Sequence, residues 1–267
     1  MRPKGETMTN RQGIPIWYEL ITPDADAAER FYGTVLGWRF ERMPSGPEMD
    51  YRIASTNGTA VAGLMQQPEG QEMPLRWLVY FGVEDVDRSV RDAEQSGASV
   101  HMPPTDIPEV GRFAFLADPQ GALFYLMRGA SDEDSQSFQC GENVPQGHAV
   151  WNELTAPDPD AAIAFYGALL GLRKEGGMPM GELGEYSFIH AGADCIGAVM
   201  GEVPNGQPGW QVYFAVDDID EAVDRLGQAG GRSIQGPDEI PGNCFALVAE
   251  DDGGARFGLV GPRTRQN

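Results

Sequence analysis

The chain contains two copies of one stretch of sequence, 134 residues apart. Residues 17–38 read WYELITPDADAAERFYGTVLGW, and residues 151–172 read WNELTAPDPDAAIAFYGALLGL, with no gap between them in the alignment. A second pair follows at an offset of 133 residues, WLVYFGVEDVDRSV from Trp77 and WQVYFAVDDIDEAV from Trp210. Repetition on this scale indicates the duplication of a whole domain, so the fold must be one that a chain of about 130 residues can form and then repeat.

The repeat divides the chain into two halves. We expect domains at residues 13–129 and 147–262, joined by a linker at residues 130–146 that is polar and rich in turn-forming residues. The segments 1–12 and 263–267 are expected to be mobile tails. Length is consistent with this division, because 267 residues are long for one domain and comfortable for two.

Each half in turn reads as two similar modules, each with a strand, a helix and about three further strands. A strand is expected for IWYELIT near the start, which is β-branched and aromatic. Asp24 then precedes apolar residues at helical spacing and Gly37 follows them, which predicts an N-cap and a C-terminal stop. A second helix is expected over Val86–Gln95, capped by Asp85 or Asp87.

Charge limits the classes of partner. The chain has 40 acidic and 19 basic residues, for a formal charge of −21. Nucleic acids and anionic membrane surfaces are bound mainly through Lys and Arg, so we expect neither as a partner. No apolar run approaches the ~20 residues of a membrane span, and the three cysteines show no disulfide or metal-ligand spacing. The polar first residues lead us to expect no signal peptide. The expected location is the cytoplasm.

The motifs resemble those of the vicinal oxygen chelate superfamily, which includes glyoxalase I, bleomycin-resistance proteins and extradiol dioxygenases. The resemblance rests on the stretch from Asp24 to Gly37 and on Asp118-Pro119-Gln120-Gly121 with Phe124. The second copies are Asp158 to Gly171 and a degraded Glu250-Asp251-Asp252-Gly253-Gly254 with Phe257. The resemblance implies an α+β fold of two tandem domains, in which paired βαβββ modules form a curved, partly open mixed sheet around a pocket.

The resemblance also indicates where a metal would be bound. Metal-using members place a His, Gln or Glu at the start of each module's first strand and a Glu on its last strand. These positions fall on Trp17, Leu78 and Tyr125 in the first half and on Trp151, Gln211 and Gly258 in the second. A divalent metal needs imidazole, carboxylate or another strong donor. Only Gln211 is a residue of the family's ligand types, so we expect no metal centre and no other cofactor, with a divalent metal as the alternative.

Strand alternation predicts the residues that line the pocket. It places Trp17 and Glu19 on one side of their strand, which the resemblance implies is the pocket side, and the same parity applies to Glu153, Tyr80 and Tyr213. Burial beside Trp should raise the pKa of each carboxyl group. We therefore predict that Glu19 and Glu153 are general acids or bases or substrate anchors, helped by hydrogen bonds from Tyr80 and Tyr213. The alternative is that each Glu has a local partner and serves packing only. Further ligand contacts are expected from Trp17, Trp151, Leu78, Gln211, Tyr125 and His190.

Three functions are compatible with these residues. The first is an atypical lyase, isomerase or oxygenase-like enzyme that uses pocket Glu and Tyr; the second is a small-molecule or drug-sequestering protein without catalysis; the third is a pair of degenerate domains that bind a protein. A small molecule is the expected ligand, and a monomeric pseudo-dimer or a homodimer is the expected assembly. The halves differ at Tyr18/Asn152, Leu78/Gln211 and Tyr125/Gly258, so we predict that they are not equivalent.

Overall fold

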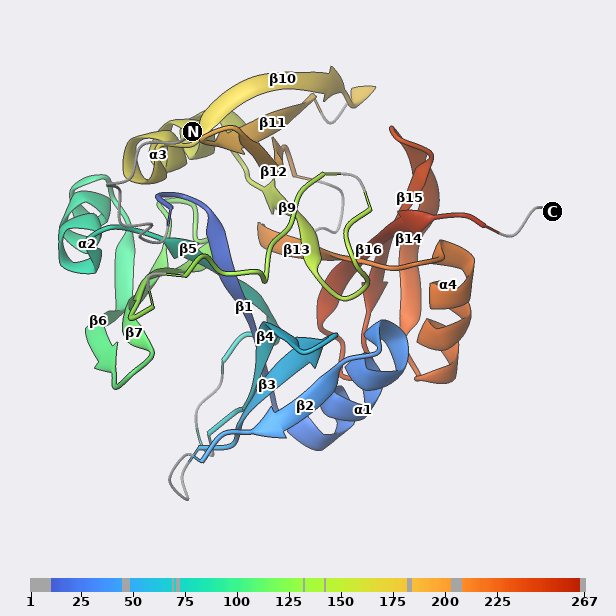
Figure 1. Ribbon diagram of the computed structural model, residues 1–267. Helices are drawn as coiled ribbons and strands as arrows, with labels where there is room; N and C mark the ends of the chain where they lie inside the picture. Colours follow the sequence, from blue (N-terminus) through green and yellow to red (C-terminus); the bar gives the residue numbers. More distant parts are fainter. Residues whose placement is uncertain are drawn as a thin grey trace, which may run out of the picture. The chain divides into compact units, whose positions relative to one another are not determined.

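The computed structural model describes residues 11–264 apart from 45–48, 69, 71–72, 132, 142, 182–183 and 203–207. Within these residues the order strand, helix, three strands occurs four times along the chain (Figure 1). The expected α+β class and the βαβββ modules are thus confirmed. In the described part of the chain, no helix is long and apolar enough to cross a membrane.

The elements follow the repeat closely. The first half supplies β1 (Pro15–Thr22), α1 (Ala25–Leu36), β2 (Arg39–Arg42), β3 (Tyr51–Thr56), β4 (Thr59–Gln66), β5 (Arg76–Gly82), α2 (Val86–Gln95), β6 (Ser99–Ile107), β7 (Gly111–Ala117) and β8 (Leu123–Gly129). The second half supplies β9 (Ala149–Thr155), α3 (Pro159–Leu170), β10 (Arg173–Pro179), β11 (Glu185–Ala191), β12 (Asp194–Met200), β13 (Gly209–Ala215), α4 (Ile219–Gln228), β14 (Arg232–Ile240), β15 (Cys244–Glu250) and β16 (Arg256–Pro262).

Each half forms one mixed eight-stranded sheet. The strand order is β2-β3-β4-β1-β5-β8-β7-β6 in the first and β10-β11-β12-β9-β13-β16-β15-β14 in the second. The pairs β1/β4, β5/β8 and β13/β16 are parallel, and the hairpin pairs are antiparallel. The register repeats as well, because Tyr80 is paired with Tyr125 and Tyr213 with Gly258, at equivalent positions of the two halves.

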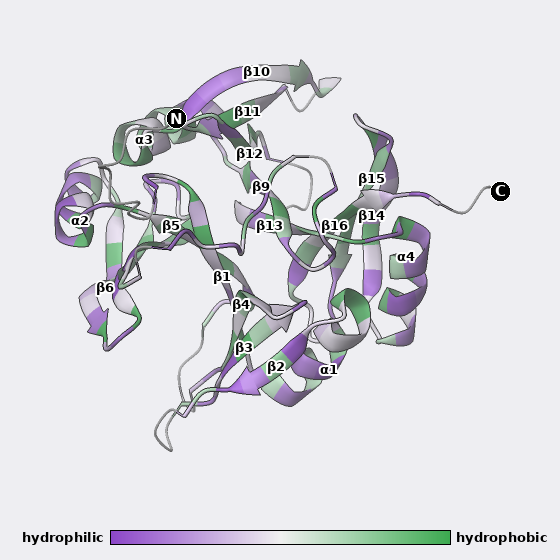
Figure 2. Cartoon of the chain, viewed as in Figure 1, coloured by the Kyte–Doolittle hydropathy of each residue, from purple (hydrophilic) through white to green (hydrophobic). Residues whose placement is uncertain are grey.

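The helices begin and end where the sequence predicts. Asp24 caps α1 by accepting the N–H of Ala27 at 2.8 Å, and Gly37 ends the helix in the left-handed conformation, at φ 72°. For α2 the cap is Asp85, which accepts the N–H of Arg88. Helix α4 carries both hydrophilic and hydrophobic residues (Figure 2), and its buried side chains include Ile219 and Leu226. Such a mixed surface is typical of a helix with one face packed on a sheet.

The chain divides into two compact units, and neither unit is a sequence half. The first comprises Met1–Ile16, Val79–Ser135 and Glu153–Trp210, and the second comprises Trp17–Leu78, Gln136–Asn152 and Gln211–Asn267. Each unit therefore combines a module from one half with the opposite module of the other half. The second unit includes part of the expected linker, where Phe138 is buried and pairs with Ala149.

Within each unit a buried chain of hydrogen bonds joins the two modules. In the second unit the indole N–H of Trp77 donates to the hydroxyl of Tyr32 at 2.9 Å, and this hydroxyl donates to Asp251 at 3.0 Å. In the first unit the same chain runs from Trp210 through Tyr166 to Asp118. In both Asp118 and Asp251, the second carboxylate oxygen accepts hydrogen bonds from two backbone N–H groups of the turn that follows.

These contacts explain the second family motif. The copy around Asp251 looks degraded in sequence, yet it keeps the carboxylate and each of its contacts. These hydrogen bonds also confirm the alternation of side chains along β5 and β13. Trp77 and Trp210 point toward the helices, on the face opposite the one predicted to line the pocket.

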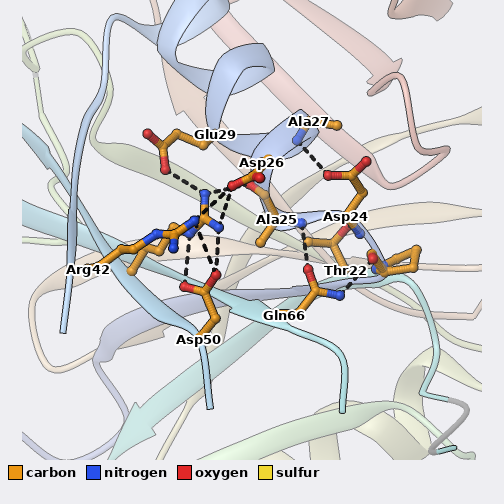
Figure 3. Close-up of polar contacts among 11 residues, drawn as sticks. Thr22, Asp24, Ala25, Asp26, Ala27, Glu29, Arg42, Asp50 and Gln66 are labelled. Atoms are coloured by element: carbon orange, nitrogen blue, oxygen red, sulfur yellow. Dashed lines mark hydrogen bonds and ion pairs between the residues drawn. The ribbon is translucent and has the colours of Figure 1, made fainter. Parts of the chain in front are cut away.

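The first module has an ion-pair cluster whose central arginine is not repeated in the sequence of the second half. The carboxylates of Asp26, Glu29 and Asp50 all pair with the guanidinium of Arg52, whose side chain is only 3 % exposed. Arg42, labelled in Figure 3 beside these carboxylates, also pairs with Asp26 and Asp50. Hydrogen bonds from Arg52 hold the pKa of Asp26 and of Asp50 below the usual range. At the equivalent position of the second half stands Ser187, so this cluster ties α1 to β3 in one copy alone.

Candidate functional site

A carboxylate and a phenol are joined in the first unit. The hydroxyl of Tyr186, on β11, donates to Oε2 of Glu153, on β9, at 2.7 Å. Both side chains are half-buried. Glu153 was expected from the sequence, whereas Tyr186 was missed. Its signal was present, because Tyr51 occupies the equivalent place on β3 of the first half.

The equivalent residues of the second unit are Trp17, Glu19 and Tyr51. There the indole N–H of Trp17 donates to the hydroxyl of Tyr51 at 3.0 Å, and Glu19 is 5 % exposed. Gly63 makes this arrangement fit, because a Cβ on Gly63 would lie 2.0 Å from the hydroxyl of Tyr51. The second half has Ala198 at the place of Gly63, so the two copies differ in the space around this phenol.

The second unit also brings two of the expected site residues together. The amide Nε2 of Gln211 donates to the hydroxyl of Tyr213 at 2.9 Å. The ring of Tyr213 packs against the Cα of Gly258, where an added Cβ would lie 1.9 Å from the ring. Gln211 and Tyr213 therefore form a hydrogen-bonded pair on β13, and the ring of Tyr213 lies beside Gly258 of β16, which has no side chain.

In the first unit the equivalent tyrosine has an aromatic partner instead. The rings of Tyr80 and Tyr125 stack with centroids 4.0 Å apart and planes inclined by 10°. Phe115 also stacks on Tyr125, with ring centroids 4.5 Å apart. The three side chains are between 4 and 7 % exposed.

The remaining expected residues are more scattered. Trp151 is half-buried on β9, two residues before Glu153, and Leu78 is buried on β5. His190 lies on β11 opposite Cys195 of β12, and its Nδ1 is buried with no hydrogen-bond partner. Burial raises the pKa of the Cys195 thiol, so this neighbour of His190 is not an activated thiolate. By alternation His190 shares the face of β11 that carries Tyr186.

The residues at the family's metal positions do not fit a metal centre. Three are Trp17, Leu78 and Tyr125, and their counterparts are Trp151, Gln211 and Gly258. This set offers one amide and no imidazole or carboxylate, whereas divalent metals in proteins are held by such strong donors. Elsewhere in the described chain, no group of three or more His, Cys, Asp or Glu lies close enough to hold a metal ion.

The family is shown by sequence as well as by fold. A sequence model of the Glyoxalase/Bleomycin resistance protein/Dioxygenase superfamily matches residues 15–126 and again residues 146–259. The chain therefore belongs to this superfamily, as a member with two tandem copies. This confirms the resemblance stated from the motifs.

Proteins of similar sequence match along nearly their whole length. One is CFP32 of Mycobacterium bovis, whose name assigns it provisionally to the glyoxylases; it is 36% identical over 260 residues, which cover 96% of this chain and 97% of the relative. Another is the anthracycline biosynthesis protein DauV of Streptomyces sp. strain C5, 31% identical over 261 residues, with 93% of each chain covered. DnrV of Streptomyces peucetius has the same kind of name and is 32% identical over 267 residues, again with 93% of each chain covered.

Solved structures share the fold. The Mn(II)-bound glyoxalase from Novosphingobium aromaticivorans aligns with a TM-score of 0.64 at 18% identity, over 95% of this chain and 83% of that one. The 2,3-dioxygenase LapB from Pseudomonas sp. KL28 aligns with a TM-score of 0.66 at 14% identity, over 96% and 95%. Since one fold carries many chemistries, the function has to be argued from the side chains of this chain.

Proposed function

We propose that this protein binds a small, partly aromatic molecule with an acidic C–H group and transfers a proton on it, with Glu153 as the base. The observation that carries the proposal is the hydrogen bond of 2.7 Å from Tyr186 to Glu153. A carboxylate on a rigid strand, oriented by a neighbouring phenol, is a suitable general base. Trp151, two residues away on the same side of β9, would contact the ligand.

The chemistry can be carried by these side chains alone. The carboxylate of Glu153 takes a proton from a carbon next to a carbonyl group and returns it to a different atom of the same molecule. Such a step is an isomerisation, or an elimination if a leaving group departs. Tyr186 acts as a positioning residue, because its hydrogen bond fixes one carboxylate oxygen. The donor set at the six metal positions supports a reaction without a metal.

The names of two relatives support an aromatic ligand. DauV and DnrV are anthracycline biosynthesis proteins, and anthracyclines are flat polycyclic ketones. Tyr186 and Phe188 add aromatic surface to β11, with ring centroids 6.1 Å apart. Flat rings favour such surroundings.

Sequestration without catalysis is the second candidate. It is favoured by the replacement of strong metal donors at Trp17, Leu78 and Trp151, because this change removes the chemistry of metal-using relatives but not the ability to bind a small molecule. The two candidates differ in one measurable property, the dependence of a chemical step on Glu153.

Proton exchange on a simple ketone tests the proposal. With 2-tetralone in deuterated buffer, we expect the protein to accelerate loss of the C1 proton signal in NMR spectra. Glu153→Gln should reduce this acceleration at least tenfold, and Tyr186→Phe should reduce it less. The matched control is Glu175→Gln, an exposed carboxylate of the same unit that pairs with Arg173. Binding with no acceleration would support sequestration, and equal rates for wild type and Glu153→Gln would overturn the role of Glu153.

A further inference from the structure

Two side chains on the strand of Tyr186 differ between the copies of the repeat. Phe188 and His190 of β11 stand where β3 of the first half has Ile53 and Ser55. Exposure alternates along β11, with half-buried residues at 186, 188 and 190 and buried residues at 187, 189 and 191. Phe188 and His190 therefore share one face with Tyr186, and this face remains accessible to solvent.

The ring of Phe188 has small neighbours on both sides. Its pairing partner on β12 is Ala198. On β10 it lies beside Gly176, where an added Cβ would be 3.5 Å from Cδ2 of the ring. Neither neighbour has a side chain long enough to cover the ring, so the exposed part of Phe188 can contact a ligand.

The candidate base lies in the same row across the sheet. In the first half one row of pairing partners runs from Glu19 through Gly63 to Ile53. Glu153 and Phe188 occupy the two ends of this row in the second half. Glu153 is half-buried, whereas Glu19 is only 5 % exposed. The accessible carboxylate, the aromatic ring and the imidazole of β11 therefore occur together in one copy of the repeat.

The imidazole of His190 has an unused hydrogen-bonding atom. Its Nδ1 is buried and has no hydrogen-bond partner among the residues that the structure describes. Arg173, which pairs with His190 from β10, donates to Glu175 instead. Cys195, which pairs with it from β12, donates its thiol proton to a backbone carbonyl.

This environment favours one tautomer of the neutral ring. One imidazole nitrogen then carries the proton and the other can only accept. With the proton on Nε2, no buried N–H is left without an acceptor. His190 is therefore a hydrogen-bond donor through Nε2, on the accessible face of β11.

We propose that His190 selects ligands that have an oxygen acceptor at the end opposite the reacting carbon, and that it binds this oxygen through Nε2–H. The inference rests on the proposed function, because it takes Glu153 as the base. Two strands and two residues separate Glu153 from His190, which places their Cα atoms about 12 Å apart. A ligand that reaches both side chains is longer than a single ring.

Phe188 contributes the surface between these two groups. It shares the row of Glu153 and precedes His190 by two residues, so a flat ring held at both ends lies against it. The substrate class is thus an extended aromatic ketone with a second oxygen at its far end. A site that donates a hydrogen bond to such an oxygen discriminates against an analogue that lacks it.

Two matched probes test this proposal. In 6-methoxy-2-tetralone the ether oxygen lies across the aromatic ring from C1, the carbon that loses its proton, and 6-ethyl-2-tetralone has nearly the same shape without that oxygen. In calorimetric titrations we expect wild type to bind the methoxy probe about fivefold more tightly, the effect of one net hydrogen bond. His190→Phe should bind both probes equally. His190→Gln retains an N–H donor and should keep part of the preference.

The control is His101→Phe, which changes an exposed histidine of the same unit that lies beside Phe115. It should keep the wild-type preference. NMR spectra of the histidine side chains give a second readout. The methoxy probe should shift the Nε2 resonance of His190 more than the ethyl probe does, and His190→Gln identifies that resonance.

The inference is overturned if wild type binds the two probes equally, if it binds neither, or if folded His190→Phe keeps the preference. If His190→Phe does not fold, the wild-type preference and the Nε2 shift decide. Exchange of 2-tetralone that depends on Glu153, without a preference that depends on His190, would refute the inference alone. A preference that depends on His190, without such exchange, would refute the proposed function alone.

Discussion

Tyr18 donates a hydrogen bond of 2.9 Å to Asn152, and these two residues occupy the same position in the two copies of the repeat. Both are buried, Tyr18 completely. In a dimer of identical chains this place would hold two tyrosines or two asparagines. Only a fused chain can place a donor phenol against an acceptor amide here, so the contact records a specialisation that followed duplication.

Truncation of this pair should be costly. Asn152→Ala leaves the buried hydroxyl of Tyr18 without this acceptor, and we expect a loss of about 2 kcal/mol in the free energy of unfolding. Tyr18→Phe should cost a similar amount, because it leaves the amide of Asn152 without its donor. Urea denaturation of both single variants and the double variant measures the coupling. A double variant whose loss equals the sum of the single losses would show that the hydrogen bond contributes nothing.

The burial of Asp251 predicts a pH dependence of stability. Burial raises the pKa of Asp251 above its usual value. The folded state therefore holds this proton more tightly than the unfolded state does. The contribution of the group is most favourable below the unfolded pKa of about 4 and declines as the pH rises through the folded value.

Asp251→Asn isolates this contribution. The difference in unfolding free energy between wild type and Asp251→Asn should shift against wild type as the pH rises from about 4 toward neutrality. The difference is the useful quantity, because other carboxylates of the chain titrate as well. Thermal unfolding at a series of pH values gives it directly. A difference that is constant over this range would contradict the prediction.

The Arg52 cluster predicts the opposite trend. Asp26 and Asp50 have lowered pKa values, chiefly through hydrogen bonds from Arg52, so their stabilising effect is present above about pH 4 and is lost as the pH falls through the folded values. At neutral pH we expect Arg52→Met to cost about 2 kcal/mol, less than a fully buried pair because the carboxylates are partly exposed.

A matched control is available on α2. Arg88 and Asp92 form an ion pair with side chains 75% and 58% exposed. Arg88→Ala should therefore change stability by less than about 0.5 kcal/mol. Denaturant unfolding at pH 7 and pH 3 compares the two variants. If Arg52→Met costs as much at pH 3 as at pH 7, the cluster does not act through its carboxylates.

The sequence was sufficient for the local structure and insufficient for the pairing of modules. Asp24, Gly37 and the apolar spacing between them predict α1, because caps and periodicity act within a few residues. The bond from Tyr32 to Asp251 joins residues 219 positions apart, and nothing in either motif indicates its partner. The resemblance led us to expect a pseudo-dimer, but the residues that join opposite modules were not foreseen.

For the candidate site, too, the sequence predicted local features but not contacts between distant residues. Strand parity predicted that Glu153 and Tyr213 would lie on the side away from Trp210, because alternation is a local rule. The partner of Glu153 was not predicted, since Tyr186 reaches it from a strand that is not its neighbour in the sheet. The role of Gly63 is visible only in the structure, where the hydroxyl of Tyr51 lies over it.

Gly63 should therefore control where the hydroxyl of Tyr51 lies. In Gly63→Ala the new Cβ would stand 2.0 Å from that hydroxyl, so Tyr51 has to leave Trp17, and we expect a loss of about 2 kcal/mol from overpacking. Tyr51→Phe removes the hydroxyl and should relieve part of that loss in the double variant. Urea denaturation of the four proteins measures this coupling, and the fluorescence of Trp17 should change in Gly63→Ala. Additive losses would mean that Gly63 is required by the backbone of β4, independently of Tyr51.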